Sequence, residues 1–141
     1  MTTKATKTTK TTKVSDKVAK GKRRILIVED DEFIMYVYEE KFPRDMYEVV
    51  FAKDGEEANA YLDKEQFNLV LLDVMMPKIN GWEVLNYIRK EKKDTVPVIM
   101  ISNLAQDSDR DKAKQLGATE YFVKSDMGIN DLMEKVLAYV K

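Results

Sequence analysis

Five short apolar runs lie along the chain, and a longer stretch of mixed apolar and polar residues follows each of them. The runs Ile25–Val28 and Leu69–Leu72 contain no polar position, which is typical of strands buried on both faces of a sheet. Between the runs, apolar residues recur three and four positions apart, as on one face of a helix. We predict strands at residues 25–28, 47–52, 69–72, 98–101 and 120–123, and helices at 31–42, 56–64, 82–91, 107–116 and 130–139.

Turn-forming residues lie at several of the predicted boundaries. Pro77 and Asn80-Gly81 force a turn directly after the third strand, and Pro43 helps to stop the first helix. Gly117 is predicted to end the fourth helix, and Asn130 is predicted to cap the fifth.

The alternation of strands and helices predicts an α/β fold. It favours a parallel sheet with right-handed crossovers and helices on both faces. A small sheet of this kind suggests a flavodoxin-like, doubly wound fold with five parallel strands in the order 2-1-3-4-5 and five helices. The 141 residues fit one such domain.

The composition excludes several kinds of chemistry. The sequence contains no His and no Cys, which rules out a Ser-His-Asp or Cys-His catalytic pair, a thiolate or His-ligated metal site and a disulfide. No apolar run approaches the ~20 residues that a membrane span needs, and the N-terminus has no apolar signal segment. We therefore expect a cytoplasmic protein whose chemistry depends on carboxylates, hydroxyls and amines.

Charge is divided unevenly along the chain. Residues 1–24 carry nine basic residues and one acidic residue, whereas residues 25–141 carry 15 basic and 24 acidic residues. We predict a disordered Lys/Thr-rich tail at residues 1–22 and an acidic domain at residues 23–141. The tail is expected to be a solubilising leader or an expression remnant; the alternative is a salt-sensitive tether to nucleic acid or an acidic surface.

Chemically active side chains follow four of the five predicted strands. Glu29 and Asp30 end the first strand, Asp73 the third, Ser102 the fourth and Lys124 the fifth. In the order 2-1-3-4-5 these four strands are neighbours, so their carboxyl ends meet in one crevice. An aspartate that ends a strand is ordinary by itself, and it is the convergence of three acids, a hydroxyl and an ammonium that indicates a site.

A cation is expected in this crevice. Three carboxylates within a few ångströms repel one another, and one would protonate unless a cation lies between them. Oxygen ligands without His or Cys favour Mg²⁺, which commonly serves to handle phosphate. Ser102 can hydrogen-bond one phosphoryl oxygen and Lys124 can pair with another. The sequence has no P-loop motif, so a nucleotide is not indicated.

These residues resemble the receiver domain of response regulators in bacterial two-component signalling, in particular the single-domain chemotaxis regulators. The resemblance covers residues 23–141. The segments that carry it are residues 25–31 (ILIVEDD), 71–77 (LLDVMMP) with Asn80-Gly81, 98–102 (VIMIS) and 122–124 (FVK).

The resemblance implies a role for each acid of the crevice. Asp73 would accept a phosphoryl group from a histidine kinase or phosphotransfer protein. Asp30, Asp73 and the backbone carbonyl of Met75 would hold Mg²⁺, and Glu29 would act through water. The protein would therefore be a phosphoprotein of phosphorelay signal transduction.

The resemblance also implies how the signal leaves the domain. Ser102 and Lys124 would bind the phosphoryl oxygens, and Tyr121 matches an aromatic switch position whose ring moves inward on activation. The face made by the fourth helix, fifth strand and fifth helix would then change its preference for a downstream protein. We expect a monomer or a phosphorylation-dependent dimer, with no membrane partner and no direct DNA binding beyond a weak contact of the tail.

The sequence departs from the family's pattern in two ways. Ser125 follows Lys124 where the family usually has proline, so we expect either a trans bond with a rearranged loop or a strained cis bond, which costs ~2.5–4 kcal/mol for a non-proline residue. Met75 and Leu104 flank the crevice and are both apolar, which suits them poorly to position an attacking water. We therefore expect slow self-dephosphorylation.

Other interpretations of the crevice differ in their chemistry. A pseudo-receiver would share the fold and act as an interaction module without taking a phosphoryl group. A haloacid-dehalogenase-type phosphatase would need a second acid two residues after Asp73, where Met75 stands. We therefore expect no enzyme, apart from weak self-phosphorylation and self-dephosphorylation. No helix-turn-helix pattern follows the last helix, so we expect a stand-alone receiver rather than a fragment of a longer regulator.

Overall fold

The computed structural model describes residues 21–140 of the chain. Strands and helices alternate through these residues in the order that the apolar pattern predicts. The elements are β1 (Arg23–Val28), α2 (Glu32–Glu39), β2 (Tyr47–Ala52), α3 (Gly55–Lys64), β3 (Leu69–Asp73), α4 (Gly81–Asn86) with a π-helical turn (Tyr87–Glu91), β4 (Val98–Ser102), α5 (Asp107–Leu116), β5 (Glu120–Val123) with a 3₁₀ turn (Lys124–Asp126), and α6 (Ile129–Leu137).

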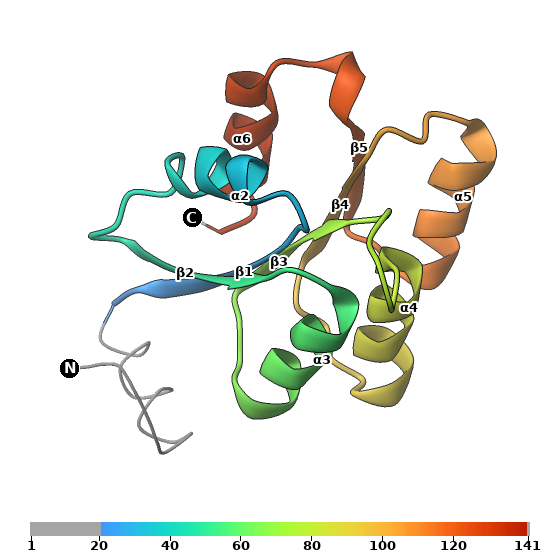
Figure 1. The fold of residues 1–141 in the computed structure, drawn as a ribbon, viewed down its shortest axis with the longest axis horizontal. Coiled ribbons are helices and arrows are strands. Elements are labelled where there is room, and N and C mark those ends of the chain that lie inside the picture. The colour runs from blue at the N-terminus through green and yellow to red at the C-terminus, as the bar shows by residue number, and fades with distance from the viewer. Residues whose placement is uncertain (1–20, 141) are drawn as a thin grey trace.

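The strands form one parallel sheet in the order β2-β1-β3-β4-β5, which confirms the predicted flavodoxin-like topology. Helices α2 and α6 cover one face of the sheet, and α3, α4 and α5 cover the other (Figure 1). Because β1 lies beside β3 with Val28 paired to Leu72, the two strands end at the same level. The residues that follow them therefore meet at the carboxyl edge of the sheet.

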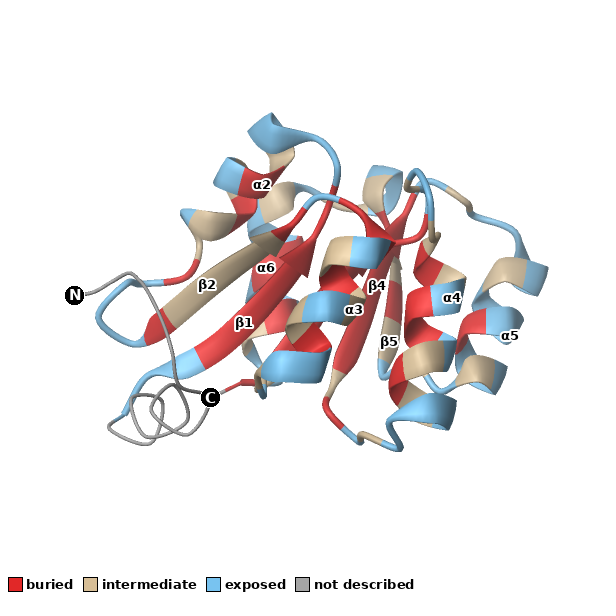
Figure 2. Ribbon diagram, turned by 60° about the horizontal axis from the view of Figure 1, so that its bottom comes forward, coloured by how far each residue is buried: buried red, intermediate tan, exposed pale blue. Residues whose placement is uncertain are grey.

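The apolar runs are buried on both faces of the sheet because each contributes to two separate cores. Leu26 and Val70 pack with α3, α4 and α5, whereas Ile25 and Leu71 pack with α2 and α6. The central strands are accordingly buried along their length, while the edge strand β2 is only half-buried (Figure 2). Each fully buried Leu, Ile or Val stabilises the fold by about 1.5–3 kcal/mol. These two cores fix the strand ends that carry the polar residues.

Short polar side chains cap the helices that start at the carboxyl edge of the sheet. The Asp31 carboxylate accepts hydrogen bonds from the backbone N–H groups of Phe33 and Ile34, and so begins α2. Asn80 and Glu83 form a reciprocal capping box at the start of α4. These caps fix where the chain leaves β1 and β3.

The predictions for several helix ends were only partly correct. Gly117 ends α5 in the left-handed conformation, with φ +97°, as predicted. The prediction that Asn130 caps the last helix was wrong, because Gly128 occupies the cap and the Asn130 amide oxygen instead accepts a hydrogen bond from Lys41 Nζ of the α2–β2 segment, at 2.7 Å. The first helix ends at Glu39 rather than at residue 42.

The helix that follows β3 also changes its winding. The backbone N–H of Lys92 bonds to the carbonyl of Tyr87, five residues earlier, so the last turn is π-helical. Arg89, within that turn, donates to the carbonyls of Asp94 and Gly117.

Two further expectations concern the N-terminal tail and the absence of a membrane span. The predicted disordered tail at residues 1–22 lies almost wholly outside the described residues. Within residues 21–140, no helix combines the length and the apolar character needed to cross a membrane.

Candidate functional site

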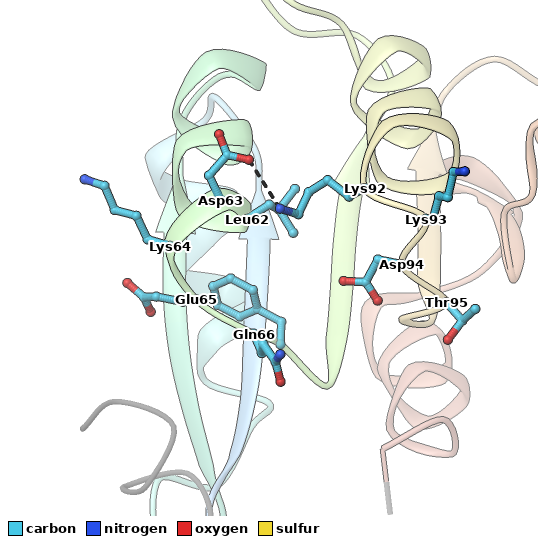
Figure 3. A pocket seen from close by; sticks show the side chains of 10 residues that line it. Leu62, Asp63, Lys64, Glu65, Gln66, Lys92, Lys93, Asp94 and Thr95 are labelled. Atoms are coloured by element: carbon cyan, nitrogen blue, oxygen red, sulfur yellow. Dashed lines mark hydrogen bonds and ion pairs between the residues drawn. The ribbon is translucent and has the colours of Figure 1, made fainter. Parts of the chain in front are cut away.

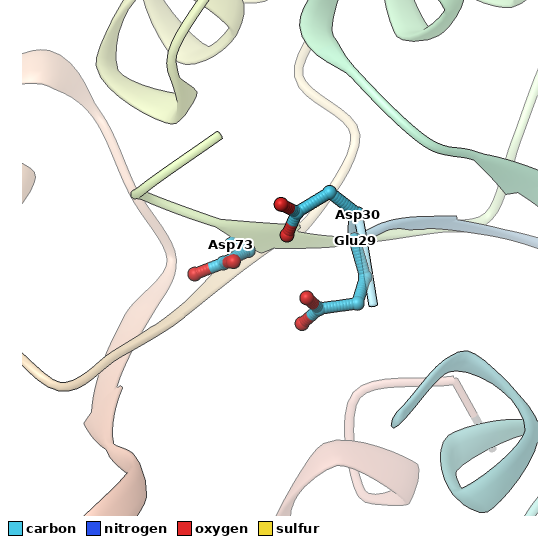
Figure 4. A group of neighbouring side chains, drawn as sticks. All are labelled: Glu29, Asp30 and Asp73. Carbon is cyan, nitrogen blue, oxygen red and sulfur yellow. The ribbon is translucent and has the colours of Figure 1, made fainter. Parts of the chain in front are cut away.

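Three carboxylates meet at the carboxyl ends of β1 and β3. Oxygen atoms of Glu29, Asp30 and Asp73 all lie within 4.8 Å of one another, and Figure 4 shows the side chains extending from neighbouring strands. Glu29 and Asp73 are buried, whereas Asp30 is exposed. The structure thus brings together the three acids that the topology placed in one crevice.

The electrostatics of this cluster disfavour full ionisation. Burial and the neighbouring Asp73 carboxylate raise the pKa of Glu29 to about 7, although Lys124 and the backbone N–H of Asp31 act in the opposite direction. Burial also raises the pKa of Asp73, against the opposing effect of Lys124. A cation placed among the oxygens would relieve the same repulsion.

Lys124 lies beside the acids at the end of β5. Its Nζ atom is 3.5 Å from Glu29 Oε1 and 3.9 Å from Asp73 Oδ1. Every peptide bond among residues 21–140 is trans, so of the two forms expected for the Lys124–Ser125 bond the structure has the trans form. The loop continues as a short 3₁₀ turn over Lys124–Asp126, and the ammonium still reaches both carboxylates.

Ser102 is the last residue of β4 and is completely buried. Its neighbour Ile101 pairs with Asp73 across the sheet, so Ser102 lies one residue beyond the level of Asp73. Its hydroxyl oxygen accepts a hydrogen bond from the backbone N–H of Leu104, at 3.0 Å. The hydroxyl proton remains able to donate to another acceptor.

The loop after Asp73 is packed tightly against the site. The backbone N–H of Gly81 donates to the carbonyl of Val74, and a Cβ atom at Gly81 would lie 2.3 Å from the carbonyl oxygen of Asp73. The backbone N–H of Met75 donates to the Asp73 carboxylate, while the Met75 side chain is 63% exposed. Whether the Met75 carbonyl binds metal stays a prediction.

Tyr121 lies on β5, which β4 separates from β3, and only 9% of its surface is exposed. Its hydroxyl donates to the backbone carbonyl of Leu104, at 2.7 Å. Its ring stacks on that of Trp82, the second residue of α4. The role of Tyr121 as a switch stays a prediction.

Two open cavities lie away from the acids. One, of about 580 Å³, lies between the end of α3 and the segment before β4, at the opposite edge of the sheet (Figure 3). Asp63 and Lys92 form an ion pair at its rim, at 3.4 Å. The other, of about 390 Å³, lies beside Trp82 between α3 and α4. Neither cavity contains a residue predicted for the site.

Comparisons with known proteins agree with this geometry. Residues 25–137 match the response regulator receiver domain family. The chain is 42% identical over 103 residues to a probable transcriptional regulator, ycf27, of Porphyridium aerugineum, covering 73% of this chain and 42% of that protein. It therefore spans less than half the length of the curated relatives it matches.

Solved structures are similar over most of the chain. A CheY-like receiver domain from Methanospirillum hungatei has a TM-score of 0.74 and 30% identity, over 84% of this chain and 93% of that one. The Mn²⁺-bound form of response regulator Rcp1 has a TM-score of 0.69 and 28% identity, over 82% and 90% of the two chains.

The fold and the acidic crevice define a signalling domain of the two-component type. The chain belongs to the response regulator receiver domain family.

Proposed function

We propose that this receiver domain accepts a phosphoryl group on Asp73 from a histidine kinase or phosphotransfer protein, in a reaction that requires Mg²⁺. The observation that carries the proposal is the cluster of three carboxylates with an ammonium 3.9 Å from Asp73. A strand-end aspartate without such neighbours would offer no means of neutralising an incoming phosphoryl group.

The residues present fit a divalent cation of the magnesium type. The three clustered side chains are all carboxylates, and burial together with the Asp73 carboxylate raises the pKa of Glu29, which a bound cation would oppose. Asp30, Asp73 and the Met75 carbonyl would hold the ion, and Glu29 would act through water. When bound, Mg²⁺ neutralises phosphoryl oxygens and lowers the barrier to transfer. The relative Rcp1 has been described in an Mn²⁺-bound form.

Each side chain of the crevice would have a different role in phosphoryl transfer. An Asp73 carboxylate oxygen forms the new bond to phosphorus while the bond from phosphorus to the donor breaks. Lys124 places a positive charge 3.9 Å from that carboxylate, and Ser102 supplies a hydroxyl donor at the end of the adjacent strand. Positioning and charge neutralisation are most of what this chemistry requires.

The output would leave through protein–protein contact at the face formed by α5, β5 and α6. A phosphorylated Asp73 adds about −1.5 to −2 charges at the crevice, and Ser102 connects this point to the α5 side through Leu104 and Tyr121. Tyr121 would serve as the switch residue of this face.

A pseudo-receiver that is not phosphorylated is the second candidate. It is favoured by one observation, the serine at position 125 after Lys124, since this departs from the family's pattern at the residue that aims the ammonium.

Intact mass spectrometry after incubation with Mg²⁺ and a small acyl-phosphate donor tests the proposal. One added phosphoryl group that requires both Mg²⁺ and Asp73 is expected, with Asp73→Asn as the matched control. If wild-type protein gains no mass, or if Asp73→Asn gains the same mass, the domain acts as a pseudo-receiver or is modified elsewhere.

A further inference from the structure

An aromatic stack connects α4 to β5 on the face of the sheet that α5 covers. The rings of Trp82 and Tyr121 are nearly parallel, with an angle of 4° and 6.1 Å between their centres. This offset arrangement is one of the preferred geometries for an aromatic pair. The two residues are 39 positions apart in sequence, so the stack is a tertiary contact that the apolar pattern does not predict.

Two cations from α5 cover this stack. Lys112 Nζ lies 4.8 Å from the centre of the Trp82 ring, and the Arg110 guanidinium carbon lies 5.9 Å from the centre of the Tyr121 ring. Both distances are within the range of cation–π attraction. Arg110 also pairs with Asp126, in the turn that begins with Lys124, at 3.2 Å. Helix α5 is thus attached to the aromatic pair and to the loop that carries the ammonium.

The stack is connected to Ser102, at the edge of the acidic crevice, through the backbone of Leu104 and through an interaction between the Tyr121 and Ser102 hydroxyls. The Tyr121 hydroxyl donates a hydrogen bond to the carbonyl of Leu104, and the backbone N–H of Leu104 donates to Ser102 Oγ. Leu104 therefore links the two side chains, because its N–H is bonded to Ser102 and its carbonyl is bonded to Tyr121. If the Tyr121 ring left its buried position, the Leu104 carbonyl would lose its partner and the β4–α5 segment would lose one of its fixed points.

Trp82 is well placed to hold that ring. It is the second residue of α4, and the first, Gly81, lies against the backbone of Asp73 and donates to Val74. The position of Trp82 is therefore set by the same backbone that sets Asp73. The stack thus lies between two parts of the site: α4 connects Trp82 to the backbone of Asp73, and Leu104 connects Tyr121 to Ser102.

We propose that Trp82 is a positioning residue that keeps Tyr121 buried and thereby orients the Ser102 hydroxyl toward Asp73. This inference rests on the proposed function, because its consequence is a faster or tighter capture of the phosphoryl group. It assigns to Trp82 a role in regulation of the site: whatever displaces α5 also removes the two cations that cover the stack.

A double-mutant cycle tests whether Trp82 acts through Ser102. Trp82→Ala is expected to slow Mg²⁺-dependent phosphorylation from a small acyl-phosphate donor by about tenfold, the scale on which one aromatic pair alters an equilibrium. In a Ser102→Ala background the same substitution is expected to change the rate by less than about twofold. Trp82→Phe retains a ring to stack on Tyr121 and is expected to restore most of the wild-type rate.

The matched control is Tyr36→Ala, which removes the partner of another aromatic pair, the edge-to-face contact with Phe51 at 5.9 Å on the other face of the sheet. It is expected to leave the phosphorylation rate unchanged. Equal effects of Trp82→Ala in the wild-type and Ser102→Ala backgrounds would overturn the proposal, as would equal effects of Trp82→Ala and Tyr36→Ala.

A second measurement separates this inference from the proposed function. In protein labelled with fluorotyrosine, the ¹⁹F resonance of Tyr121, assigned with Tyr121→Phe, is expected to move toward the solvent-exposed position in Trp82→Ala even without a phosphoryl donor. An unchanged resonance would refute the positioning role. Failure of wild-type protein to gain a phosphoryl group would refute the proposed function and leave the result of this measurement standing.

Discussion

The close approach between Gly81 and Asp73 allows a sharp test of how the fold positions the proposed phosphoacceptor. In Gly81→Ala the new Cβ atom would lie 2.3 Å from the carbonyl oxygen of Asp73 and 2.7 Å from the Cα atom of Val74. Both obstacles are backbone atoms, so no side-chain rotation relieves the overlap. Either the start of α4 or the end of β3 must move.

The expected cost follows from this geometry. Overpacking of a well-ordered site destabilises proteins by about 1–3 kcal/mol, and we expect the free energy of unfolding of Gly81→Ala to fall within that range. Because the displaced backbone belongs to Asp73, the rate of phosphorylation should fall further than stability alone requires. A misplacement of ~1 Å at a reacting group costs roughly 10²-fold in rate.

Gly128→Ala is the matched control. Gly128 has φ −71° and no atom within 4 Å of the position that a Cβ would occupy, so the substitution introduces no overlap. Its free energy of unfolding should remain within about 1 kcal/mol of wild type. Urea denaturation followed by Trp82 fluorescence measures stability, and intact mass measures the phosphorylation rate. If Gly81→Ala matched Gly128→Ala in both assays, the structural argument for the fixed position of Asp73 would fail.

Three further predictions concern the charges and the apolar positions of the site. Without metal, the free energy of unfolding should decrease as pH rises from 4.5 to about 7, because the pKa of Glu29 is higher in the folded protein than in the unfolded chain. The loss is at most about 3 kcal/mol. Urea denaturation in the presence of a chelator measures it, and the plot of stability against pH should be flatter for Glu29→Gln. Lys124→Met should slow phosphorylation by about 10²-fold, as measured by intact mass, while Mg²⁺ still quenches or enhances Trp82 fluorescence; a rate near wild type would show that Ser125 leaves the ammonium unproductive. The acyl phosphate on Asp73 should be long-lived, and replacing Leu104 with Glu should shorten its lifetime in a decay experiment; a short wild-type lifetime would refute the inference from the apolar neighbours.

The layout of the fold was predictable because it depends on short patterns within the sequence. An all-apolar strand such as Leu69–Leu72 can only be satisfied by burial on both faces, and that requirement leads to the parallel, doubly wound sheet that the structure has. The meeting of Glu29 with Asp73 followed from the same topology. It needed no knowledge of side-chain contacts.

Contacts between distant polar side chains were less predictable. Asn130 was expected from its residue type to cap the last helix. Its side chain instead accepts a hydrogen bond from Lys41, 89 positions earlier in the sequence, and Gly128 occupies the cap. Arg110 and Lys112 lie in a helix whose sequence is only weakly amphipathic, and no local pattern distinguishes them from other exposed charges. Their positions over Tyr121 and Trp82 depend on how three elements pack together.

The loop after Lys124 shows what such contacts can contribute. A proline at position 125 would restrict the backbone by its own ring, whereas serine imposes no such limit. Here the loop forms a 3₁₀ turn that holds Asp126 against Arg110 of α5, and Lys124 remains within reach of both buried acids. The Arg110–Asp126 pair is exposed and is worth no more than about 1 kcal/mol, so it can bias the loop without locking it. We therefore expect the position of α5, the helix that also covers the Trp82–Tyr121 stack, to influence the aim of the ammonium, so that a partner that moves α5 would act on Lys124 and on Ser102 together.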